Sequence, residues 1–95
     1  MARRRLHVMA EWGDTFPVWE RTPGMNVGGI DPAESGLSEQ LVQDLIAWNA
    51  QWEILFAAEP PGTEEEQRVW MRAGRGLAKR VGLEIGGDVM VTYQP

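Results

Sequence analysis

The chain contains no cysteine and only one histidine. The lack of cysteine excludes a disulfide framework, a thiolate metal site and a cysteine nucleophile. No stretch approaches the ~20 apolar residues that a membrane-spanning helix needs. The three arginines at residues 3–5 are followed by a segment that His7 and Glu11 interrupt, so no apolar core of a secretory signal is present there. We therefore expect no signal peptide, no membrane contact and a cytoplasmic location.

Basic residues are in the minority, with nine Lys and Arg against fourteen Asp and Glu and a net charge of −5. An acidic protein repels phosphate backbones, so nucleic acid is not an expected partner. The pairs at 28–29 and 86–87 are the only adjacent glycines, and neither matches a phosphate-binding fingerprint. His7 has no recognisable nucleophile partner, and no calcium-loop spacing occurs. The sequence predicts no cofactor, no metal and no enzymatic activity.

What is present is the composition of an ordinary globular domain. The 95 residues are 43% hydrophobic and 24% charged, which predicts one domain over residues 1–95. Five tryptophans supply much of the apolar surface. Because each indole N–H needs a hydrogen-bond partner, tryptophan is expected at the rim of the core rather than at its centre.

Alternation of apolar and polar residues predicts strands at residues 5–12 and 88–94. Residues 16–19 predict a short strand that is an edge or begins at Pro17, because proline donates no ladder hydrogen bond. Gly13 and Asp14 separate the first two strands, which favours an antiparallel hairpin. Residues 22–36 are rich in glycine and proline and show no period, so they predict a long flexible loop.

Two amphipathic helices are predicted between the second and last strands. Ser38 is a suitable N-cap for the first helix, which ends near residue 57 or 58. Thr63 and Glu66 form a capping-box pattern that opens the second helix. That helix ends either at Gly82 or, as we prefer, at a C-cap on Gly86.

The order of elements is strand, strand, helix, helix, strand. It predicts an α+β fold with two layers, a three-stranded mixed sheet in the order 2-1-3, and a two-helix hairpin on one face. The last strand lies parallel to the first, and its placement beside the second strand is the alternative. The expected buried layer consists of Leu6, Val8, Ala10, Leu41, Leu45, Trp48, Trp52, Trp70, Leu77, Val81, Val89 and Val91.

Several segments together resemble a known group of sequences. They are residues 10–13, 17–19, 37–41, 45–53, 76–81 and 89–93, with a Trp-Asn-x-x-Trp pattern at Trp48 and Trp52. The chain is similar to short uncharacterised proteins from actinobacteria and their phages. No activity is attached to that group. The resemblance implies such an origin and a cytoplasmic setting, without a mechanism.

Small size, acidic charge and missing catalytic motifs favour a non-enzymatic binding or regulatory protein, such as a phage-type inhibitor or an immunity protein. It would act through protein–protein contacts. Two candidate surfaces are an open sheet face and the end of the strand hairpin, with the candidate residues His7, Met9, Glu11, Asp14, Trp19, Glu20 and Met90. A structural homodimer is the alternative, and a small-ligand binder or enzyme is less favoured.

Overall fold

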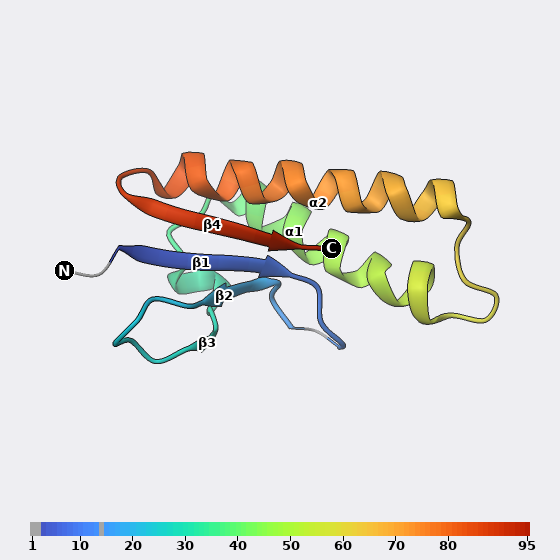
Figure 1. Cartoon of the computed structure of the whole chain (residues 1–95), viewed down its shortest axis with the longest axis horizontal. Coiled ribbons are helices and arrows are strands. Elements are labelled where there is room, and N and C mark those ends of the chain that lie inside the picture. Colours follow the sequence, from blue (N-terminus) through green and yellow to red (C-terminus); the bar gives the residue numbers. More distant parts are fainter. Residues whose placement is uncertain (1–2, 14) are drawn as a thin grey trace.

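The computed structural model describes residues 3–13 and 15–95, so Asp14 lies outside the described residues. The chain forms two layers, with helices packed on one face of a sheet (Figure 1). The elements in chain order are β1 (Arg4–Met9), β2 (Val18–Glu20), β3 (Gly28–Gly29), a 3₁₀ turn (Pro32–Glu34), α1 (Glu39–Trp52), a π-helical turn (Glu53–Ala57), α2 (Glu64–Ile85) and β4 (Val89–Gln94).

The sheet has four strands in the order β3-β2-β1-β4. β1 pairs antiparallel with β2, with His7 opposite Trp19, and parallel with β4, with His7 opposite Thr92. The α+β class is therefore confirmed. The predicted count of three strands and the predicted order are wrong, because β3 adds an antiparallel edge strand through the pair Trp19 and Gly29.

The added strand lies inside the segment predicted to be a long flexible loop, residues 22–36. The amide of Ile30 donates to the carbonyl of Val18 at 3.1 Å, which extends the pairing beyond β3. Asp31 then caps the 3₁₀ turn by accepting from the amide of Ala33 at 2.9 Å. A two-residue strand made of glycine has no side-chain alternation, so periodicity could not reveal it.

The strands of the first hairpin are shorter than predicted. β1 ends at Met9 rather than Trp12, and β2 begins at Val18 rather than Phe16. The cause is a side chain from α1, because Asn49 Oδ1 accepts the Glu11 amide at 2.8 Å and so takes it away from any strand ladder.

The helices begin where the capping residues predict. Ser38 Oγ accepts from the amide of Leu41 at 3.2 Å at the start of α1. Thr63 and Glu66 form a complete capping box at the start of α2. α2 ends at Ile85 with its C-cap at Gly86, whose positive φ of 69° favours glycine, so the longer helix is confirmed. The last turn of the first helix is π-helical, which the sequence did not reveal.

The centre of the core is a pair of tryptophans that joins the two helices. The rings of Trp48 and Trp70 stack with their centroids 4.3 Å apart and their planes 4° from parallel. Each indole N–H donates to the backbone carbonyl of the other residue, at 3.0 and 2.8 Å. The expectation that tryptophan lies at the rim is wrong for this pair, because each indole finds its acceptor on the neighbouring helix inside the core.

The tryptophan pair depends on a glycine in α2. A Cβ built on Gly74 would lie 2.7 Å from Trp48 Cε2 and 2.5 Å from the hydroxyl of Tyr93. That hydroxyl donates to the carbonyl of Met71 at 2.6 Å and so ties β4 to α2. Around this centre lie the other buried apolar side chains of the core, which are Leu6, Val8, Phe16, Val18, Leu41, Leu45, Leu77, Ala78 and Val81.

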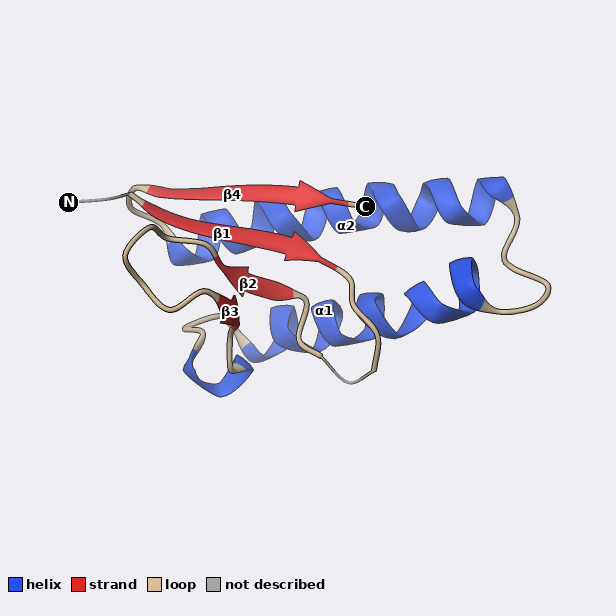
Figure 2. Ribbon diagram, turned by 60° about the horizontal axis from the view of Figure 1, so that its bottom comes forward, coloured by secondary structure: helices blue, strands red, loops and turns tan. Residues whose placement is uncertain are grey.

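The molecule is elongated, measuring 47 by 22 by 22 Å. Figure 2 shows why: the joined ends of α1 and α2 extend well beyond the ends of β1 and β4. Within residues 3–13 and 15–95, no helix combines the length and apolarity needed to cross a membrane.

Candidate functional site

Four of the candidate residues gather on the sheet face that the helices leave open. Strand alternation places His7, Met9, Trp19 and Met90 on this face, which we call the open sheet face. His7 Nδ1 lies 2.7 Å from the hydroxyl of Thr92, and the indole of Trp19 donates to the carbonyl of Met9 at 3.0 Å. The structure therefore brings together a histidine, an indole and two thioethers.

The open sheet face carries basic rather than acidic charge. Arg5 and Arg21 are exposed, and the amide of Arg21 donates to the carbonyl of Arg5 at 2.9 Å. Burial, followed by the positive charge of Arg21, lowers the pKa of His7 below its ordinary value of 6.5. His7 is therefore mainly neutral at physiological pH.

Glu20, a candidate residue for the hairpin end, lies away from Glu11 and turns toward the helices. Glu20 faces the helices, is only 8% exposed and lies opposite Leu6 near the start of β1. Its carboxylate accepts from Thr22 at 2.6 Å and pairs with Arg4 at 3.3 Å. Glu11 lies beyond the other end of β1, in the connection to β2. Glu20 is thus buried and held in polar contacts within the fold.

The connection between β1 and β2 is held against α1 by a buried side chain that sequence reasoning missed. Asn49 accepts from the Glu11 amide and donates to the carbonyls of Gly13 and Thr15 at 3.4 and 3.0 Å. Glu53 accepts from the Gly13 amide at 2.9 Å. The available signal was an asparagine in mid-helix, inside the Trp-Asn-x-x-Trp pattern. Asparagine is disfavoured in a helix interior unless its side chain makes a specific hydrogen bond.

The same connection presents an exposed indole. Trp12 meets Trp52 edge-on with 4.9 Å between ring centroids, yet it remains 57% exposed. Trp52 was expected in the buried layer, and it is the second tryptophan of the Trp-Asn-x-x-Trp pattern. In the structure it is only partly buried, and its ring packs against Trp12.

α1 turns an uncharged face toward solvent. Between Asp44 and Glu53 the helix has no charged residue, and its exposed side chains there are Ile46, two alanines and the uncharged Gln51. Ile46 is 49% exposed, and Ile54 is 65% exposed in the π-helical turn that follows. We call the exposed residues Ile46, Ala47, Ala50 and Ile54 the α1 ridge.

Grooves run along both sides of the α1 ridge. On the α2 side lies a groove of about 470 Å³, which we call the tip groove, lined by Gln51, Ile54, Leu55, Val69, Trp70 and Ala73. It continues past Gln51 and Ala73 into a hollow of about 410 Å³ beside Ala47 and Gly76. On the other side, Phe16, Ile30 and Pro32 line a groove of about 450 Å³ against Ile46 and Ala50.

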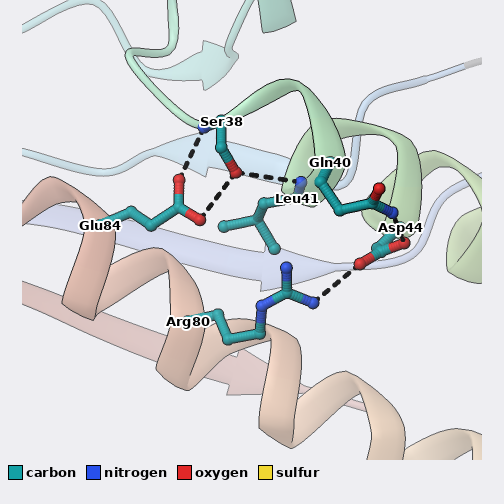
Figure 3. Close-up of polar contacts among 6 residues, drawn as sticks. All are labelled: Ser38, Gln40, Leu41, Asp44, Arg80 and Glu84. Atoms are coloured by element: carbon teal, nitrogen blue, oxygen red, sulfur yellow. Dashed lines mark hydrogen bonds and ion pairs between the residues drawn. The ribbon is translucent and has the colours of Figure 1, made fainter.

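Polar bonds lock the two helices together at the end remote from the tip groove (Figure 3). Ser38 donates its amide and its hydroxyl to the Glu84 carboxylate, at 2.6 and 2.8 Å. Arg80 meets Asp44 at 2.8 Å. The amide and hydroxyl of Ser38 lower the pKa of Glu84, and the hydrogen bond from Arg80 lowers that of Asp44. These bonds hold the start of α1 against the last turns of α2.

Charge is distributed unevenly along the molecule. Residues 53–68, at the overhanging end of the helix pair, contain five glutamates and one arginine, a net charge of −4. Farther along α2, the exposed residues Arg72, Arg75 and Lys79 recur at helical spacing and form a basic stripe. One end is therefore acidic, whereas the open sheet face and the outer side of α2 are basic.

These surfaces have the features of a protein-binding face. Among the described residues, no three histidine or acidic side chains gather closely enough to hold a metal ion. An exposed apolar ridge between grooves, rimmed by polar residues, is typical of a protein-binding surface. The fold and surface therefore define a small α+β protein-binding domain.

Comparison with known families identifies the kind of binder. The model of a family described as Serratia CdiI immunity protein-like matches residues 4–95, so the chain belongs to that family. No curated protein matches the chain. An immunity protein acts by binding a partner toxin, so the prediction of a protein-binding, immunity-like role is confirmed. The match carries no information about an actinobacterial or phage origin.

Proposed function

We propose that the chain is a non-enzymatic immunity protein that neutralises its toxin by forming a stoichiometric complex. Membership of the immunity family supports binding of a toxin. Binding alone is sufficient for protection when the complex covers the surface that the toxin needs. No chemical step by this chain is required.

The observation that carries the proposal is the α1 ridge. Ile46 and Ile54 are large aliphatic side chains, 49% and 65% exposed, on a helix face without charge. The 19 residues from the start of α1 to the end of the π-helical turn span roughly 28 Å at about 1.5 Å per residue. That length suits a standard interface of ~800 Å² per partner. The ridge is therefore the first surface we assign to the toxin.

The open sheet face is a second candidate surface. Trp19, Met9 and Met90 are residue types that interfaces favour, and methionine adapts to irregular partners. Glu11 and Asp14, also predicted from the sequence, would contact a partner only at the neighbouring β1–β2 connection. A homodimer, a cytoplasmic location and a single domain over residues 1–95 stay predictions from the sequence.

Co-expression with candidate toxin domains tests the function. We expect the chain to restore growth against one of them, and the purified pair to form a complex at a fixed molar ratio. Titration of the toxin's activity should reach full inhibition only at that ratio. Complete inhibition of the toxin by far less than one equivalent of the chain would contradict a purely binding role. Growth that stays inhibited by every toxin tested, with no complex between toxin and chain, would contradict the immunity function.

Matched surface variants separate the two faces. Ile46→Lys places a charge on the α1 ridge, and Met90→Lys places the same charge on the open sheet face, where Met90 is 37% exposed. Val27→Lys is the control, because Val27 is exposed in the segment before β3. We expect Ile46→Lys alone to weaken protection. Loss of protection with Met90→Lys alone would assign the toxin to the sheet instead.

A further inference from the structure

The overhanging end of the helix pair has an apolar groove that stays open to solvent among residues 3–13 and 15–95. α2 has 22 residues and β4 has six, so at about 1.5 and 3.3 Å per residue the helix outruns the strand by roughly 13 Å. Figures 1 and 2 both show this end of the helix pair projecting past the sheet. The tip groove lies here, between Ile54 of the π-helical turn and Val69 of α2.

The walls of the tip groove are aliphatic and its floor is rigid. Ile54 and Val69 are 65% and 51% exposed at the rim. Trp70 forms the floor and cannot rotate to cover them, because its ring stacks on Trp48 and its indole N–H is bonded at 2.8 Å. The ring of Phe56 supports Trp70 from another side, at 5.1 Å between centroids. The groove is therefore pre-formed.

The charge around the tip groove selects the chemistry of the partner. Glu65 and Glu66 line the groove, within the segment 53–68 that holds net charge −4 out of −5 for the whole chain. The open sheet face, by contrast, carries Arg5 and Arg21. A basic partner is attracted to the tip and repelled from the sheet.

We propose that the tip groove receives an aliphatic side chain of the toxin that is flanked by lysine or arginine residues. This inference rests on the proposed function, since it takes the toxin as the partner. The volume of about 470 Å³ lies within the range of about 300–1,000 Å³ that is usual for ligand-binding pockets. Ile54 belongs both to the groove and to the α1 ridge, so the inserted side chain anchors a wider interface along α1.

Lysine substitutions in the groove test the apolar contact. The double variant Ile54→Lys/Val69→Lys should weaken toxin binding at least tenfold, because it fills an anchor site with charges that repel a basic partner. The control is Leu83→Lys/Val27→Lys, which makes the same kind of change at aliphatic residues that are 74% and 66% exposed elsewhere. Equal binding by the two double variants would overturn the inference.

Neutralising substitutions test the charge. Glu65→Gln/Glu66→Gln preserves the capping box, since glutamine also serves at its third position. Glu34→Gln/Glu39→Gln removes the same two charges at the far end of the molecule. Only the first pair should slow association with the toxin and reduce its dependence on salt. If both double variants associate with the toxin equally fast, this result would contradict a basic partner at the tip groove.

A defined peptide tests the groove without the toxin. A peptide of alternating lysine and leucine should shift the NMR signals of Ile54, Val69 and the Trp70 indole, and added salt should reverse the shifts. The matched glutamate–leucine peptide should leave them unchanged. Shifts located elsewhere, or shifts from both peptides alike, would refute the proposed chemistry of the groove.

The outcomes distinguish this inference from the proposed function. Peptide binding in the groove by a chain that neutralises no toxin would remove the immunity function and keep the groove as a basic, aliphatic binding site. Normal neutralisation by the Ile54→Lys/Val69→Lys variant would keep the immunity function and remove the groove as its anchor.

Discussion

A single methyl group at Gly74 should unsettle the whole core, whereas the same change two residues away should stabilise it. In Gly74→Ala the new Cβ would lie 2.5 Å from the Tyr93 hydroxyl and inside contact distance of the Trp48 ring. At Gly76 a Cβ would meet no heavy atom within 4 Å. Both glycines lie within α2, so helix propensity favours alanine at each by about 1 kcal/mol.

The magnitude for Gly74→Ala follows from what must move. The Trp48 ring has to shift, although it is already stacked on Trp70 with 4.3 Å between ring centroids. Overpacking costs about 1–3 kcal/mol, and disturbing the two reciprocal indole bonds adds about 1 kcal/mol for each. After subtraction of the propensity gain, we expect a loss of about 2–4 kcal/mol in the free energy of unfolding. Gly76→Ala should instead gain about 0.5–1 kcal/mol.

Urea unfolding and thermal unfolding, both followed by tryptophan fluorescence, measure the stability of the two variants. The stacked pair of Trp48 and Trp70 is part of the fluorescent probe. At about 4–8 °C per kcal/mol for a domain of this size, the thermal midpoint of Gly74→Ala should fall by at least about 8 °C. A rise for Gly74→Ala similar to that for Gly76→Ala would refute the close packing of Trp48, Tyr93 and α2.

Three further predictions concern the side chains of Asn49, Glu84 and His7. Asn49→Ala should cost about 1–3 kcal/mol, because it removes the partner of half-buried backbone groups at Glu11 and Thr15. Amide exchange at residues 11–15 should accelerate while helical circular dichroism is kept. The pKa of Glu84 is below its ordinary value of 4.5 in the folded state, so its contribution to stability is present above pH 4.5 and is lost as the pH falls through the folded pKa. Glu84→Gln should therefore flatten the acid side of the urea-midpoint curve, and an unchanged curve would contradict the bonds from Ser38. The pKa of His7 is lowered, so its NMR titration midpoint should lie below pH 6.5. Its contribution to stability should be present above pH 6.5 and lost as the pH falls through the folded pKa. A midpoint above 6.5 would contradict its burial beside Arg21.

The helices were predictable because their signals are local. Ser38, Thr63 and Glu66 mark the two starts, and Gly86 marks the end of α2, all through bonds within one turn of helix. The parallel and antiparallel neighbours of β1 also followed from the order of elements. β3 did not, since a pair of glycines has no side chains to alternate.

The candidate site was predictable only in part, because its deciding contacts are long-range. Strand alternation placed His7, Met9 and Met90 correctly on one face. It could not show that Glu20 turns inward to Arg4, which depends on the register between β1 and β2. The exposure of Ile54 and Val69 was also hidden, because an apolar residue on an amphipathic helix is normally assigned to the core.

The location of the toxin on this protein is the central claim, and amide hydrogen exchange of the chain with and without its bound toxin tests it most directly. We predict slower exchange in the complex at residues 44–55 and 65–73, with the amides of β1 and β4 unchanged. Protection confined to the sheet, with the helix pair exchanging as in the free protein, would contradict the assignment of the α1 ridge and the tip groove to the toxin.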